Sequence, residues 1–202
     1  MITSLLVFLW QFLLKEKTPL HSYKMNINTE NLDKTIEHWA SIDGYLNYQV
    51  SWWGRVVNTK TGLILRARTS PLGYQRVNWY IDGKQKTHTI HQLVAREWVR
   101  NPGEKQCVDH IDGNRKNNHW ENLRYATHTE NARNSAKTSK PTSSIYKGVC
   151  FHTRHDKWIA NVQLGRKLKH LGYFVNEREA AEAYNAAAVL HYTNFAKLNT
   201  LD

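Results

Sequence analysis

Asp109 and His110 place a carboxylate and an imidazole side by side at the end of a short apolar segment. A loop rich in Asn, Asp and Gly follows and contains Asn122, and the polar segment beyond it contains Asn131. Carboxylate and amide oxygens suit hard cations such as Mg²⁺ or Mn²⁺, and an imidazole can act as a general base near neutral pH. These residue types at this spacing therefore indicate a metal-assisted hydrolase more than a packed core.

The elements that would position these residues can be predicted from local patterns. Residues 106–111 alternate as a brief strand does, and the Asp-Gly-Asn run at 112–114 is typical of a turn. Residues 123–126 can form a second strand, and Thr127 with Glu130 is the pattern of a capping box that begins a helix. This order puts the acid–imidazole pair at the end of the first strand and the later asparagine on the first helical turns, facing it.

The same stretch resembles the HNH nuclease motif, also called ββα-metal, and is most similar to the branch found in phage and intron homing endonucleases. The matching residues are 108–114, Asn117, Asn118, 121–127, Glu130 and Asn131. The third motif letter is Asn rather than His, an exchange that is common in this branch. The resemblance implies one Mg²⁺ or Mn²⁺ per active site, bound by Asp109 and Asn131. It also implies that His110 is the general base and that Asn122 orients its ring through a hydrogen bond.

The composition points to nucleic acid as the partner. The chain has 202 residues and a formal net charge of +11, which implies a polyanionic ligand. Its two cysteines form no CxxC pair, so neither a zinc knuckle nor a disulfide framework is supported, and an intracellular setting fits best. We expect double-stranded DNA as the partner, no small-molecule substrate, no stable membrane partner and a monomeric protein.

The N-terminal end carries an apolar run at residues 2–14. This run is shorter than the roughly 20 residues of a membrane-spanning helix, and no basic segment precedes it as in a signal peptide. We interpret residues 1–36 as a leader that is disordered or not native. A membrane anchor and an amphipathic packing segment remain alternatives.

Residues 37–87 form the first module, in which aromatic and β-branched residues between Gly and Asn turns predict short strands. This module resembles NUMOD4, a small module that precedes HNH motifs in homing endonucleases. The matching residues are Trp39, Ile42, Gly44, Tyr45, Tyr48, Val50, Ser51, Gly54, Arg55 and Val56. The DNA-contact candidates in this module are Arg55, Arg66, Arg68 and Arg76, and those in the Asn-rich loop of the nuclease segment are Arg115 and Lys116. Arginines on an exposed strand face that bind no ligand are the alternative.

Residues 88–134 are the predicted nuclease segment. Its first part, residues 88–99, has helical spacing with Trp98 in the apolar stripe, and His91 is expected to be structural rather than a ligand. Residues 135–144 are polar and lack apolar periodicity, which indicates a linker.

Residues 145–202 form the third module. We predict strands at 146–151, 158–164 and 168–174 and a helix at 177–191 that Asn176 caps. This arrangement resembles the AP2 DNA-binding domain, in which a three-stranded antiparallel sheet packs on one helix. The matching residues are Tyr146, Lys147, Gly148, Val149, Lys157, Trp158, Ala160, Leu171, Gly172, Phe174, 179–181, Ala183, Tyr184, Ala187, Leu198 and Asn199.

The resemblance implies that the sheet face turned away from the helix meets the major groove of DNA. The candidates for contact are Lys147, His152, Arg154, Lys157, Trp158, Gln163 and His170. Cys150 and His152 stand where AP2 domains often have arginines, which puts arginine–guanine readout at these positions in doubt. Trp158 has an alternative position in the core beneath the helix.

Together these features predict a modular α+β protein in which two DNA-binding modules flank a ββα-metal nuclease. We expect a site-specific DNA endonuclease of the homing type that hydrolyses phosphodiester bonds. The alternatives are a sequence-specific DNA-binding regulator with an inactive nuclease core and a restriction or defence nuclease.

Overall fold

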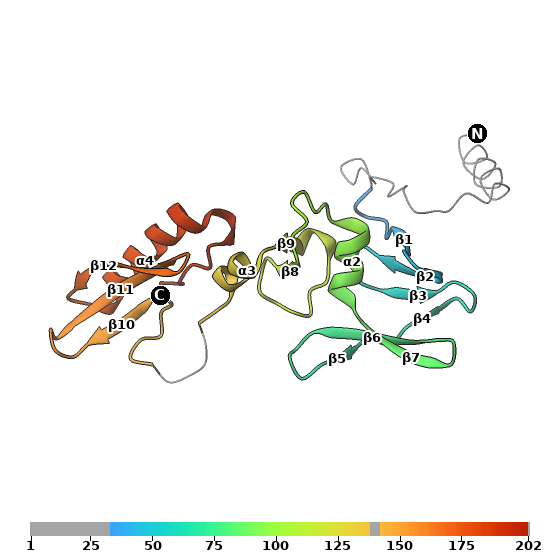
Figure 1. Cartoon of the computed structure of the whole chain (residues 1–202), viewed down its shortest axis with the longest axis horizontal. Helices are drawn as coiled ribbons and strands as arrows, with labels where there is room; N and C mark the ends of the chain where they lie inside the picture. The colour runs from blue at the N-terminus through green and yellow to red at the C-terminus, as the bar shows by residue number, and fades with distance from the viewer. Residues whose placement is uncertain (1–32, 138–141, 202) are drawn as a thin grey trace. The chain divides into compact units, whose positions relative to one another are not determined.

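The computed structural model describes residues 33–137 and 142–201, which form an α+β fold composed mostly of strands (Figure 1). The apolar run at residues 2–14 and most of the expected leader lie outside the described residues. Within the described ranges, no helix is long and apolar enough to cross a membrane.

The first sheet is antiparallel, with strands in the order β1-β2-β3-β4. Its strands are β1 (Trp39–Ile42), β2 (Tyr45–Ser51), β3 (Val56–Asn58) and β4 (Leu63–Ile64). Gly44 has a φ of +78° in the turn between β1 and β2, a conformation that glycine adopts at little cost. The short strands that we predicted in this module are confirmed.

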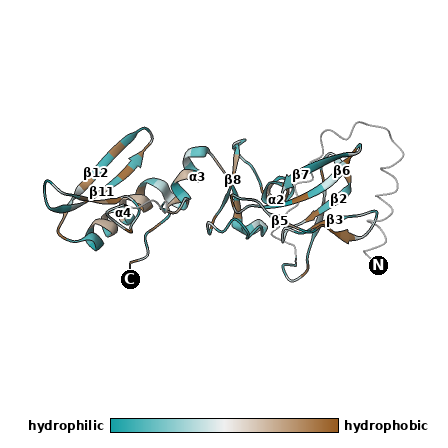
Figure 2. Ribbon diagram, turned by 90° about the horizontal axis from the view of Figure 1, so that it is seen from below, coloured by the Kyte–Doolittle hydropathy of each residue, from teal (hydrophilic) through white to brown (hydrophobic). Residues whose placement is uncertain are grey.

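The second sheet contains β5 (Arg68–Thr69), β6 (Gln75–Ile81) and β7 (Lys84–Thr89). Val77 and Trp79 on β6 are buried, whereas Arg76, Asn78 and Tyr80 are half-buried or exposed on the other face. Such period-two alternation is expected of a sheet that packs on one side only. Hydrophobic and hydrophilic positions accordingly mix along the strands in Figure 2.

Helix α2 (Ile90–Trp98) follows β7 directly. It begins two residues later than predicted because positions 88 and 89 belong to β7. Its apolar stripe is buried against the first two sheets, and the indole Nε1 of Trp98 donates a 3.2 Å hydrogen bond to the carbonyl of Val50. The prediction that Trp98 is a core residue is therefore confirmed.

The predicted order of strand, loop, strand and helix is confirmed. The strands are β8 (Cys107–His110) and β9 (Leu123–Ala126), the helix is α3 (His128–Asn134), and the loop between the strands ends in the short helix η2 (Trp120–Asn122). Strands β8 and β9 pair antiparallel. The capping box at the start of α3 is complete, since the side chains of Thr127 and Glu130 each accept a backbone hydrogen bond from the other residue.

The C-terminal sheet has the antiparallel order β10-β11-β12, formed by Val149–His152, Lys157–Leu164 and Lys167–Phe174. Helix α4 (Glu177–Tyr192) packs on one face of it, and the short helix η3 (Thr193–Phe195) follows. The side chain of Asn176 caps α4 as predicted, by accepting a hydrogen bond from the amide of Glu179.

Strand β10 begins three residues later than predicted, just after Gly148. This glycine has a φ of +75°, and a Cβ atom there would lie 2.1 Å from the ring of Tyr184. The chain therefore turns at Gly148 and passes against the helix before the strand begins.

Candidate active site and nucleic-acid interface

Asp109 is buried on β8 and stands opposite Arg124 on β9. The Nε and Nη2 atoms of Arg124 donate hydrogen bonds of 2.9 and 2.7 Å to Oδ2 of the carboxylate. The side-chain amide of Asn134 on α3 donates to both carboxylate oxygens, at 3.1 Å for Oδ1 and 3.0 Å for Oδ2. A buried carboxylate needs such compensation, and these neighbours hold the side chain of Asp109 in one orientation.

His110 is 4% exposed at the end of β8, and its Nε2 atom lies 3.3 Å from Oδ1 of Asn118. Burial lowers the pKa of its imidazole, and the hydrogen bond to Asn118 and the nearby aspartates oppose this shift only in part. His110 is therefore neutral near pH 7, which is the form that a general base requires.

His91 on α2 places a second imidazole against the first, with ring centroids 4.9 Å apart. Burial, with the adjacent His110 as a smaller cause, lowers the pKa of His91 to about 4. His91 is 6% exposed, as expected for a structural histidine, but its Nδ1 atom is buried without a hydrogen-bond partner in the described part of the chain.

Asn122 does not make the contact that we expected with His110, because Asn118 occupies that position. The Nδ2 atom of Asn122 donates 2.9 Å hydrogen bonds to Oδ1 of Asp112 and to the carbonyl of Asn117, and its Oδ1 accepts from the amide of Asp112. Asn122 therefore holds the loop together. Asn118 is one of two adjacent asparagines in this loop, and the spacing alone does not indicate which of them faces the ring.

The α3 asparagine that contacts Asp109 is Asn134 rather than Asn131. Asn134 is buried, and its amide also donates a 2.9 Å hydrogen bond to the carbonyl of His110. Asn131 is half-buried and lies three residues earlier, which puts the two on the same side of the helix. That spacing is the signal in the sequence that could have identified Asn134.

The residues around Asp109 fit a hard cation better than a soft one. Oδ1 of Asp109 accepts one hydrogen bond and Oδ2 accepts three, so Oδ1 has the greater capacity for a ligand bond. The other available donors are side-chain amide oxygens on α3. Across residues 33–137 and 142–201 there is no group of three or more His, Cys, Asp and Glu residues that could hold a metal. Oxygen donors of this kind suit Mg²⁺ or Mn²⁺ rather than Zn²⁺.

The predicted DNA-contact arginines of the first module have different surroundings. Arg66 and Arg68 are exposed, and Arg68 pairs directly with Arg76 across β5 and β6. Arg55 is engaged by an ion pair with Glu37 and lies over the ring of Trp39. The face that carries Arg76 also presents polar residues that our sequence reasoning missed, which are Asn78, Tyr80, Gln85 and Thr87.

Two basic residues of the nuclease loop are exposed. Arg115 donates a 2.6 Å hydrogen bond to the carbonyl of Leu72 and lies over the ring of Tyr74, 4.8 Å from its centroid. Lys116 is exposed beside it. These contacts fix Arg115 against the first module.

Two of the candidates in the C-terminal module lie away from the outer face of the sheet. Trp158 packs against the core between the sheet and α4, its alternative position, because it pairs with Phe174 and Phe151 on that face. The ammonium of Lys147 is directed inward, where its Nζ donates to the carbonyls of Arg133 and Ser135 at 2.6 Å, and burial lowers its pKa. Neither side chain is therefore part of the DNA-binding surface that we propose.

The outer face of the same sheet carries the remaining candidates. His152 and Lys157 stand opposite each other on β10 and β11, and His170 on β12 lies 4.8 Å from the ring of Tyr173. Gln163 on β11 and Arg154 in the turn are exposed. This face carries aromatic and basic groups and lies opposite the helix.

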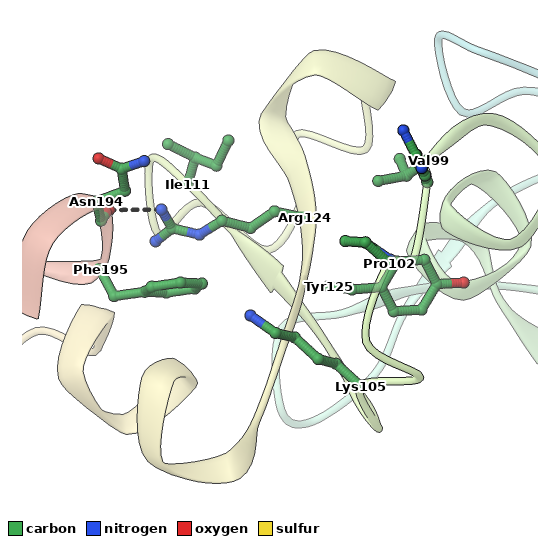
Figure 3. A pocket seen from close by; sticks show the side chains of 9 residues that line it. Val99, Pro102, Lys105, Ile111, Arg124, Tyr125, Asn194 and Phe195 are labelled. Atoms are coloured by element: carbon green, nitrogen blue, oxygen red, sulfur yellow. Dashed lines mark hydrogen bonds between the residues drawn. The ribbon is translucent and has the colours of Figure 1, made fainter.

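A surface pocket adjoins the nuclease segment but contains neither Asp109 nor His110 (Figure 3). Its polar lining is cationic, with Arg100, Lys105 and Arg124. Arg124 also donates a 2.5 Å hydrogen bond to the carbonyl of Asn194 and lies over the ring of Phe195. Arg124 thus stands between the pocket and Asp109.

Two segments of the chain match known protein families. Residues 91–133 match a family described as HNH endonuclease, and residues 37–80 match the NUMOD4 motif. Both resemblances inferred from the sequence are confirmed by these matches. The HNH match includes Asp109, His110, Asn122 and Asn131.

Individual proteins are similar to part of the chain. The chain is 38% identical over 110 residues to DNA endonuclease I-HmuI of Bacillus phage SP01, which covers 54% of this chain and 62% of I-HmuI. A solved structure, "DNA binding and cleavage by the HNH homing endonuclease I-HmuI", is 40% identical with a TM-score of 0.46, and the match covers 48% of this chain and 56% of that chain. The chain therefore spans less than two thirds of I-HmuI.

The C-terminal resemblance has narrower support. The AP2-like ethylene-responsive transcription factor ANT of Arabidopsis thaliana is 45% identical over 49 residues, which are 23% of this chain and 9% of that protein. The identification therefore applies to segments of the chain: residues 91–133 match the HNH endonuclease family, residues 37–80 match the NUMOD4 motif, and 110 residues are similar to I-HmuI.

Proposed function

We propose that this chain is a site-specific DNA endonuclease of the homing type that hydrolyses a phosphodiester bond with one divalent cation. The main support is the pairing of Asp109 and His110 at the end of β8, inside the segment that matches HNH endonucleases. The carboxylate is buried and oriented, and the imidazole beside it is neutral near pH 7. This combination is what metal-assisted hydrolysis requires.

In this proposal His110 removes a proton from the attacking water. Asp109 and Asn131 hold Mg²⁺ or Mn²⁺, and Asn134 is a further candidate because its amide already contacts Asp109. When bound, the cation would neutralise the charge that develops on the phosphate and the leaving oxygen. Asn122 acts by holding the loop that follows β8.

Two surfaces would bind double-stranded DNA. One is formed by Arg68 and Arg76 of the second sheet, by Arg66 just before it, and by Arg115 and Lys116 of the nuclease loop. The outer face of the C-terminal sheet forms the other, with His152, Arg154, Lys157, Gln163 and His170. The net charge of +11 supports this partner, because cationic surfaces gain affinity for DNA through counterion release.

The test is cleavage of supercoiled DNA that carries the candidate insertion site, in Mg²⁺ and in EDTA. We expect metal-dependent nicking if the protein acts as a monomer and linear product if two copies act together. Tight, salt-sensitive binding without cleavage in Mg²⁺ or Mn²⁺ would instead establish the alternative, a DNA-binding regulator with an inactive core.

A further inference from the structure

Asn118 is 3% exposed and connects the first module with the ring of His110. Its Nδ2 atom donates a 2.9 Å hydrogen bond to Oε1 of Gln75 on β6 and a 3.2 Å bond to the carbonyl of Lys116. Its Oδ1 atom lies 3.3 Å from Nε2 of His110. A continuous series of hydrogen bonds therefore links Gln75 to His110 through a single buried amide.

These partners determine which way the amide of Asn118 faces. A backbone carbonyl only accepts hydrogen bonds, so the NH₂ group of Asn118 must face Lys116, and the amide oxygen must then face the imidazole. Because an amide oxygen also only accepts, Nε2 of neutral His110 must carry the ring hydrogen. Nδ1 is then the unprotonated nitrogen that can take a proton.

Packing holds Asn118 in place as well. Gly54, which follows β2, has a φ of +86°, and a Cβ atom there would lie 2.8 Å from Cβ of Asn118. The amide of Trp120 donates a 2.8 Å hydrogen bond to the carbonyl of Trp52. The loop that carries Asn118 is thus seated on the segment that matches NUMOD4.

We propose that Gln75 and Asn118 are positioning residues that hold His110 in the Nε2–H tautomer. The NUMOD4 segment would then contribute to the catalytic machinery in addition to any contact with DNA. This inference rests on the proposed role of His110 as the general base. A hydrogen bond to one ring nitrogen of a functional histidine commonly fixes its tautomer in this way.

The direct test is ¹⁵N NMR of the full chain with labelled histidine rings, at a pH where His110 is neutral. The variant Gln75→Glu keeps an acceptor for Asn118, whereas Gln75→Met removes it with little change in length. We expect wild type and Gln75→Glu to show Nε2–H at His110. Gln75→Met should show a mixture of tautomers, because the amide of Asn118 loses one of its two acceptors, and Asn118→Leu should as well.

The kinetic test separates positioning from DNA binding. Gln75→Met should lower the single-turnover cleavage rate about tenfold, as the loss of a hydrogen bond that orients a functional side chain typically does, with the Kd for DNA unchanged. Gln75→Glu should restore the rate, and thermal unfolding of each variant controls for folding. A wild-type tautomer in both Gln75→Met and Asn118→Leu would overturn the proposal. A protein that shows the tautomer shift but never cleaves DNA would refute the proposed function and leave the positioning intact.

Discussion

Asp109 on β8 is buried and bonded from two sides, by Arg124 on β9 and by Asn134 on α3. Lys157 on β11, by contrast, is exposed on the outer face of the C-terminal sheet, where its register partner is His152. The first region holds its polar groups in one geometry, whereas the second leaves them accessible to solvent. Catalysis requires fixed geometry, and binding to a flexible polyanion requires accessible charge.

The largest effect is expected on the rate of DNA cleavage when a residue of the buried region is replaced. His110→Ala should lower the cleavage rate by about 10²- to 10⁴-fold, since it removes the proposed general base, and should leave DNA affinity nearly unchanged. The measurement is single-turnover cleavage together with equilibrium DNA binding. His128→Gln, at an exposed position on α3, is the control. A wild-type rate in His110→Ala would refute the mechanism.

The next effect concerns stability. Arg124→Ala leaves the buried carboxylate of Asp109 without its cationic partner and should lower the free energy of unfolding by about 3–5 kcal/mol. The exposed pair of Arg178 and Glu182 on α4 is the matched control, and Arg178→Ala should cost less than about 1 kcal/mol. Denaturant unfolding of both variants tests the contrast, and equal losses would contradict it.

Acid should destabilise the buried region through His91. Its pKa is about 4 in the folded chain, against an ordinary value of 6.5, so between these values the unfolded chain binds the additional proton. The contribution of His91 is therefore complete above pH 6.5 and is lost as the pH falls toward 4, by up to about 3 kcal/mol. The difference in unfolding free energy between wild type and His91→Phe across this range measures it. A difference that does not change with pH would refute the assignment.

The smallest effect should come from the exposed region. Lys157→Ala should weaken DNA binding about equally for all sequences. The slope of the logarithm of the binding constant against the logarithm of the salt concentration should become shallower by about one. Cleavage of fully bound DNA should keep its rate. Titrations at several salt concentrations test this, and an unchanged salt slope would exclude Lys157 from the phosphate contacts.

The elements were largely predictable because their signals are local. The capping box of Thr127 and Glu130, the Asn176 cap and the alternation along the strands are read within a few residues. The strand and helix boundaries differed by one to three residues where tertiary contacts intervene, as at Gly148, which passes against Tyr184.

The sequence predicted which types of side chain form the site better than it predicted which individual asparagines take part. Asp109 and His110 lie together as the motif predicts, and Asn118 rather than Asn122 contacts the ring of His110. Asn134 contacts Asp109, while metal binding by Asn131 stays a prediction. Asparagines in a polar loop or on a short helix look alike in sequence. Which of them meets the site depends on how the loop and the helix are seated.

The sequence by itself therefore determined the chemistry of this protein: an acid–imidazole pair, amide oxygens, a basic surface and the order of strands and helices that carries them. Only the tertiary structure decided which amide faces His110 and how that amide is turned. The physical reason is distance along the chain. The partner that orients Asn118 is Gln75, 43 residues earlier, and no local pattern records a hydrogen bond between side chains so far apart in the sequence.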